Sequence, residues 1–229
     1  MRMHSTAPLA ALAFAIALAV APARAQDGQD IDKVNGSIHA EAGKAYGSLE
    51  TVNGSIRIDA NARVGTAETV NGSIRMEAGA QAGSLETVNG SIRVEERSRT
   101  GALATVNGSI FVDRGGSVGG GVETVNGSIG LVDTDVSGGI ETVNGDITVG
   151  VGSHVRGGIR VVKPQNNWGF SIRKKNQRDP RVIIGPNARV DGPLVFERKV
   201  ELWVHSTART GAITGATAQP FSTDAPPRR

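Results

Sequence analysis

Charged side chains recur about every 18 residues along the first two thirds of the chain, in three sets that share this spacing. One set is mainly basic, an acidic set follows it by two residues, and a second acidic set precedes it by seven. The members are His39, Arg57, Arg75, Arg93 and Phe111 in the first set; Glu41, Asp59, Glu77, Glu95 and Asp113 in the second; and Glu50, Glu68, Glu86, Glu123 and Glu141 in the third. Carboxylates are oxygen ligands for divalent cations, and rows of mixed charge can bind an acidic glycan.

A solvated surface is the alternative for these rows, because basic and acidic rows on neighbouring strands offset each other and exposed ion pairs are common. An enzyme needs one distinctive group of residues, whereas here every unit offers the same ones. The four histidines, His4, His39, His154 and His205, lack metal-ligand spacing, and the chain has no cysteine. We therefore expect no catalytic residue, no metal and no cofactor.

The charged rows belong to a repeated unit whose most regular part reads Val-Asn-Gly-Ser-Ile. Six copies begin at Val34, Val52, Val70, Val88, Val106 and Val125, and a seventh, at Val143, has Asp in place of Ser. The spacing is 18 residues except for one step of 19, which we place at the glycines of residues 119–121. Seven copies at a fixed period indicate a repeat architecture.

Each unit alternates apolar and polar residues on both sides of Asn-Gly, as in residues 48–52 and 55–59, which predicts two short half-buried strands. In a β-solenoid, Asn-Gly is a corner between strands of one coil. In an antiparallel hairpin meander, Asn-Gly is a two-residue turn, for which it is a strong signal. The corner residues are Asn35, Gly36, Asn53, Gly54, Asn71, Gly72, Asn89, Gly90, Asn107, Gly108, Asn126, Gly127, Asn144 and Gly145.

Two observations favour the solenoid. Every sixth position between Val64 and Val118 is also apolar, except for Thr100, as a three-sided coil of 18 residues predicts. The recurring Asn tolerates left-handed corner geometry, and stacked amides can hydrogen-bond along a rod. Aromatic residues are only 3% of the chain, so the core must be thin and aliphatic. We predict an all-β, three-sided β-helix, with a right-handed coil.

The Thr-Val-Asn-Gly-Ser-Ile repeats resemble those of a secreted bacterial β-solenoid family of adhesin type, over roughly residues 31–152. Residues 184–192 and 204–211 resemble coils of the bactofilin or hexapeptide type. The first resemblance implies surface binding. The second resemblance implies end-to-end polymerisation. Bactofilins are cytoplasmic, however, whereas the N-terminus of this chain predicts export.

The N-terminus is typical of a secretory signal peptide: Arg2 is followed by an apolar run at residues 9–20 and by Ala23 and Ala25 around a cleavage position. We predict a signal peptide at 1–25, the seven-repeat solenoid at 26–162 and a basic loop insertion at 163–180. The final coils and cap are expected at 181–216 and a disordered tail at 217–229. The protein is thus predicted to be periplasmic, secreted or on the cell surface, with no transmembrane segment after cleavage.

The two ends of the mature chain differ in charge. Residues 26–162 have a balance of −6 and residues 163–229 a balance of +7. The basic part suggests contact with an anionic surface through Arg173, Lys174, Lys175, Arg178 and an outward-facing Trp203. Export argues against nucleic acid as the partner.

The sequence therefore favours a non-enzymatic, exported, adhesin-like structural protein whose repetitive surface binds the envelope or a polymer, such as an anionic polymer or a glycan. Two alternatives stay open: a bactofilin-like protein that assembles into homo-oligomers or filaments, and, more distantly, a carbohydrate-active β-helix enzyme.

Overall fold

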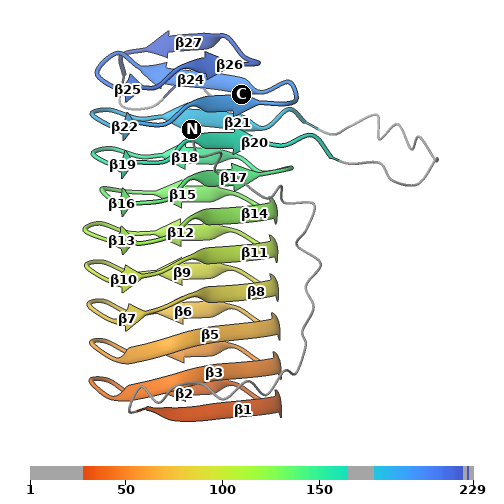
Figure 1. Ribbon diagram of the computed structural model, residues 1–229, viewed down its shortest axis with the longest axis vertical. Coiled ribbons are helices and arrows are strands. Elements are labelled where there is room, and N and C mark those ends of the chain that lie inside the picture. Colours follow the sequence, from red (N-terminus) through yellow and green to blue (C-terminus); the bar gives the residue numbers. More distant parts are fainter. Residues whose placement is uncertain (1–27, 165–177, 224–225, 227–229) are drawn as a thin grey trace, which may run out of the picture.

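Parallel strands stacked in about ten coils form a β-solenoid (Figure 1). The computed structural model describes residues 28–164, 178–223 and 226, and all regular structure within them is β. Ile74 lies between Ile56 and Ile92, its equivalents one repeat away on either side. Pairing across one repeat confirms the predicted solenoid and excludes the hairpin meander. The handedness of the coil stays a prediction.

Each regular coil contributes three strands, as in β7 (Gln81–Ala82), β8 (Leu85–Asn89) and β9 (Ile92–Val94). We call strands equivalent to β7, β8 and β9 first-type, second-type and third-type strands. First-type and second-type strands belong to a 17-stranded sheet, and third-type strands belong to a 10-stranded sheet. The other strands of the larger sheet are β1 (Gln29–Asn35), β3 (Ala45–Asn53), β5 (Arg63–Asn71), β10 (Arg99–Thr100), β11 (Leu103–Asn107), β13 (Ser117–Val118), β14 (Val122–Asn126), β16 (Asp135–Val136), β17 (Ile140–Thr142), β19 (His154–Val155), β20 (Ile159–Val161), β22 (Arg189–Val190), β23 (Leu194–Phe196), β25 (Arg209–Thr210) and β26 (Ile213–Thr214). Those of the smaller sheet are β2 (Ile38–Ala40), β4 (Ile56–Ile58), β6 (Ile74–Met76), β12 (Ile110–Val112), β15 (Ile129–Leu131), β18 (Ile147–Val149), β21 (Arg181–Ile184), β24 (Glu201–His205) and β27 (Ala218–Phe221).

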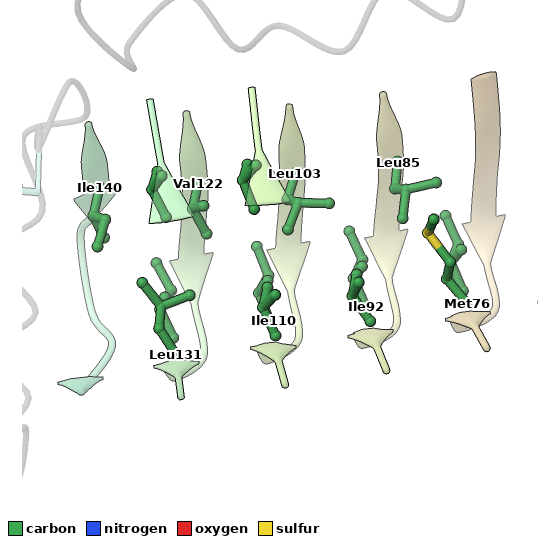
Figure 2. Close-up of a cluster of buried hydrophobic side chains, with 14 of the residues drawn as sticks. Met76, Leu85, Ile92, Leu103, Ile110, Val122, Leu131 and Ile140 are labelled. Atoms are coloured by element: carbon green, nitrogen blue, oxygen red, sulfur yellow. The ribbon is translucent and has the colours of Figure 1, made fainter. Parts of the chain in front are cut away.

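The core is a set of aliphatic stacks that run along the rod. Leu85, Leu103, Val122 and Ile140 form one stack, and Figure 2 shows them projecting into the space between the two sheets. All four are at most 1% exposed. Stacking like upon like in parallel strands buries these side chains without aromatic residues, which explains how so few large side chains suffice.

Threonine, not valine, faces the core beside the Asn-Gly corner. Thr87 is fully buried, and its hydroxyl donates a 2.8 Å hydrogen bond to the Gly72 carbonyl in the coil below. Val88 is half-exposed on the outer face of the same strand. The six-residue spacing of apolar residues therefore does not mark one set of core positions. The buried hydroxyl is tolerated because a backbone carbonyl of the neighbouring coil accepts its hydrogen bond.

The Asn-Gly corners stack closely along the rod. Amide hydrogen bonds of 2.9–3.1 Å join the seven Asn side chains in sequence. A Cβ on Gly90 would lie 2.0 Å from the Gly72 carbonyl oxygen. Glycine is required at most of these corners by the approach of the adjacent backbone, and the repeated Asn residues do not have positive φ.

Left-handed geometry recurs at a different corner, the one before most first-type strands. Gly43, Asn61, Gly79, Arg97 and Gly115 hold this corner in successive coils, with φ between 56° and 72°. Gly, Asn and Asp adopt this conformation at low cost, whereas arginine does not. The sequence interpretation gave the repeated Asn a left-handed conformation, which is wrong; at the Asn-Gly corners positive φ occurs only at glycines, Gly36 and Gly127.

Replacing Arg97 by glycine should therefore stabilise the protein by up to about 1 kcal/mol, by relieving strain at φ 56°. The loss of its exposed ion pair with Glu96 offsets little of this gain. Urea unfolding followed by circular dichroism measures the change. Arg99→Gly, in strand β10, is the control and should destabilise, since glycine weakens a strand. A lower midpoint for Arg97→Gly would contradict the assignment of strain.

The solenoid extends further towards the C-terminus than the sequence predicts. β27 (Ala218–Phe221) pairs with β24, and Phe221 is only 7% exposed. Its ring packs edge-on against Trp203 and His205, with centroids 6.5 Å and 5.0 Å away. The boundary expected at 216 is therefore wrong, because an aromatic residue beyond it closes the last coil. The predicted signal peptide at 1–25 lies outside the described residues.

Candidate binding faces of the solenoid

The basic row and the acidic row beside it neutralise each other on the outer side of the 10-stranded sheet. Each arginine bridges two coils: Arg57 lies 2.9 Å from Asp59 and 3.0 Å from Glu77, and Arg75 repeats this with Glu77 and Glu95 at 2.9 Å. Arg93 pairs with Glu95 and then covers the Phe111 ring at 4.8 Å. This arrangement supports the solvated-surface interpretation for these two rows.

Two of the paired carboxyls, Asp59 and Asp191, have a lowered pKa. The His39 hydrogen bond, and then that of Arg57, hold the pKa of Asp59 below its usual range. His154 and then Arg189 do the same for the pKa of Asp191 near the other end of the rod. Charge pairing explains both shifts, so they do not point to catalysis.

The third charged row is different. It lies on the outer side of the second-type strands, where Asp32 stacks on Glu50 at the N-terminal end and Arg160 follows Glu141 at the other. Within the residues that the structure describes, four of its carboxylates form no ion pair: Glu50, Glu68, Glu86 and Glu123. Valines of the Val-Asn-Gly segments run beside the row: Val34 and Val52 are exposed, and Val70 and Val88 are partly exposed. This face offers unneutralised acceptors next to apolar surface.

Burial raises the pKa of the Glu50, Glu68 and Glu123 carboxyls above their ordinary values. Stacked neighbouring carboxylates add to the rise at Glu50 and Glu68. Desolvation and like charge both disfavour the ionised form. The row therefore costs folding stability at neutral pH.

Glu68→Gln should raise the free energy of unfolding at pH 7 by a few tenths of a kcal/mol, after allowance for solvent screening. Because its folded pKa is raised, the penalty is present above that pKa and disappears as pH falls through it. The advantage of the variant should therefore vanish near pH ~4. Asp59→Asn, at a carboxyl of lowered pKa, is the control of opposite sign. Melting curves from pH 4 to pH 8 measure both, and a less stable Glu68→Gln at pH 7 would count against the unpaired row.

The residues predicted to bind an anionic surface are only partly described. Arg173, Lys174 and Lys175 lie outside the described residues. Arg178 is exposed beside a shallow hollow that Lys199 and Glu201 also line. Trp203 is half-buried: its indole N–H donates a 2.7 Å hydrogen bond to Glu201, and the Arg181 guanidinium lies 5.7 Å from its ring. Within the described part, Arg178 and Trp203 therefore lie at the same end of the rod.

Sequence reasoning missed a groove on the outer side of the second-type strands. We call this side, which carries the third charged row, the acidic face. The groove has a volume of about 410 Å³ and is lined by Gly121, Gly139, Gly158, Glu123, Glu141 and Arg160, among others. The signal was present in the sequence, because the residue before the inward-facing aliphatic is larger in the earlier units and becomes glycine in three successive units. The sequence interpretation used only the first of these glycines, as part of the 19-residue step at residues 119–121.

The fold and its faces define the protein as a parallel β-solenoid with repeated charged surfaces. No protein-family model matches the chain, and no curated protein or solved structure is significantly similar to it. No group of His, Cys, Asp or Glu among the described residues is arranged to hold a metal ion. The described segments also contain no helix long and apolar enough to cross a membrane.

Proposed function

We propose that this protein is an exported, non-enzymatic, adhesin-like scaffold that binds a polymer of the cell envelope along its length. The observation that supports this most is register. Equivalent outward side chains repeat on parallel strands one coil apart, as Glu50, Glu68 and Glu86 do. A contact made with one unit of a linear polymer is offered again in the next coil, so weak contacts add through high effective concentration.

The unpaired acidic row gives independent support. A rod selected only for stability would pair these carboxylates with arginines, as the neighbouring face does at Glu77 and Glu95. Stacking them without cations costs stability, and such costs are commonly retained where function requires them. Carboxylates accept hydrogen bonds from hydroxyl groups, so a glycan is the polymer that suits this face. The basic C-terminal part of the sequence supports contact with an anionic surface at that end.

The test is co-sedimentation of the mature protein with peptidoglycan sacculi and with lipopolysaccharide, followed by titration with polysaccharide fragments of graded length. Affinity should rise with fragment length until a fragment spans the acidic face. A variant with Glu50, Glu68 and Glu86 changed to Gln should bind more weakly, whereas Arg63→Gln with Arg99→Gln, on the first-type strands, should not. Affinity independent of length overturns the proposal, and new reducing ends would favour the enzyme alternative.

Self-assembly is the second candidate, favoured by the exposed strand β1. In the described part of the chain, β1 pairs only with β3 and leaves its other edge open, whereas β27 at the opposite end carries Pro220. Open edges pair readily with other chains, and proline blunts them. Sedimentation velocity over a range of concentrations distinguishes the two candidates, because only assembly makes the sedimentation coefficient rise with concentration.

A further inference from the structure

The groove on the acidic face arises where a row of side chains is interrupted. In the first coils this row holds Asp30, Ser48, Thr66, Ser84 and Ala102, each placed just before an inward-facing aliphatic residue. In the next three coils it holds Gly121, Gly139 and Gly158. The loss of three successive side chains opens the 410 Å³ groove along the rod axis.

The three glycines that line this groove have backbone N–H groups that the rest of the described solenoid does not use. The carbonyls of Gly121, Gly139 and Gly158 each accept a hydrogen bond of 2.9–3.0 Å from the coil below. Their N–H groups donate none within the described residues. The first coils show what such an N–H can bind: at the equivalent position, the Ser48 N–H donates a 2.7 Å hydrogen bond to a carboxylate oxygen of Asp30. An unsatisfied N–H in a groove favours an acceptor oxygen from a ligand.

A carboxylate and a guanidinium lie beside these backbone N–H groups. A Cβ on Gly121 would lie 3.6 Å from a Glu123 carboxylate oxygen, which places this acceptor beside the glycine row. Arg160 lines the far part of the groove and is held by Glu197, to which its Nε donates a 3.0 Å hydrogen bond. A guanidinium has five N–H donors, more than this pairing uses. The lining of the groove thus includes both donors and acceptors.

We propose that this groove binds a hydroxyl-rich glycan segment laid along the rod axis. Each hydroxyl both donates and accepts, which matches backbone N–H groups next to a carboxylate and a guanidinium. The volume lies within the range of ligand sites, and one sugar unit per coil suits the spacing of stacked strands, about 4.8 Å. The proposal deepens the proposed function by assigning one specific site on the face, and it rests on that function for the class of polymer.

Other ligands fit the groove less well. An extended peptide binds by adding to a sheet edge, whereas this groove lies on the outer side of strands that are already paired on both sides. A simple cation would meet the Arg160 guanidinium and the glycine N–H groups. The hydroxyl groups of a glycan can bind the glycine N–H groups, the carboxylates and the guanidinium.

Isothermal titration of the mature protein with three hexasaccharides tests the proposal: a neutral β-1,4-linked glucose chain, a uronic acid chain and a glucosamine chain. Gly121→Thr fills the groove with the side chain that the same row carries at Thr66. Its Cβ would lie 3.3 Å from the Gly139 carbonyl oxygen, which must shift by a few tenths of an ångström, so a melting curve first establishes that the variant is folded. Ala102→Thr, one coil away in the same row and exposed, is the matched control.

At least one hexasaccharide should bind. At a temperature where the melting curve shows Gly121→Thr to be folded, this variant should weaken binding about tenfold or more, while Ala102→Thr should bind as the parent does. The preferred sugar then shows whether the ligand is neutral, acidic or amine-bearing. Equal binding by Gly121→Thr and the parent overturns the groove but leaves the proposed function standing if polymers still bind. Absence of binding to every hexasaccharide also overturns the groove. Absence of binding to every polymer overturns the proposed function itself.

Discussion

Gly90→Ala is expected to destabilise the rod by about 3 kcal/mol or more, because the new Cβ would lie 2.0 Å from the Gly72 carbonyl oxygen. That oxygen belongs to backbone, so no flexible side chain can move aside. Relief requires the two coils to separate at the corner, which strains the hydrogen bond from the Asn89 amide to Asn71 and the bond from Gly72 N–H to the Asn89 carbonyl. Urea unfolding monitored by far-ultraviolet circular dichroism measures the loss.

Gly119→Ala is the matched control. Its Cβ would lie 3.6 Å from the nearest atom, the Thr100 carbonyl oxygen, which is an ordinary contact, and its φ is not in the left-handed region. This variant should change the free energy of unfolding by less than about 1 kcal/mol. If both variants lose stability equally, glycine serves chain flexibility at Gly90, and close stacking of the corners is not the reason for its recurrence.

The Asn-Gly corner shows which features of the fold could be predicted. The period of 18 residues and the recurrence of Asn led to stacked coils with amides in contact, and these amides are hydrogen-bonded. The hairpin alternative used the same dipeptide, and only the register between repeats excludes it. Local turn chemistry could not separate the two, because it describes one unit, whereas the solenoid is determined by contacts between units.

Periodicity also could not show which side of each strand faces inward next to the corner. Thr87 and Val88 differ little in volume, and hydrophobicity alone would bury the valine. The buried position goes to threonine because its hydroxyl can reach the Gly72 carbonyl of the coil below. The groove escaped prediction for a related reason: it is defined by side chains that are missing from Gly121, Gly139 and Gly158, and glycines were considered only for chain flexibility.

Leu85→Ala and Val88→Ala test this inward and outward assignment within one strand. Leu85 is fully buried and stacks between Ala67 below and Leu103 above, so truncation leaves a cavity in this stack. We expect a loss of about 3 kcal/mol, within the range for buried leucine. Val88 is half-exposed on the outer face and should cost less than about 1 kcal/mol.

A rod built from repeats need not unfold as one unit, so Leu85→Ala should destabilise the coils around residue 85 more than the distant coils. Hydrogen exchange on the Leu85→Ala protein should show the largest loss of protection in β5, β8 and β11, which pair around the cavity. The terminal coils should be affected least, since each coil contacts only its neighbours. Val88→Ala should leave this pattern unchanged. If Val88→Ala is the more damaging variant, the inward and outward sides of the strand are the reverse of those described. The Val-Asn-Gly valines would then belong to the core, and the glutamates of the third charged row would not lie on the outer surface.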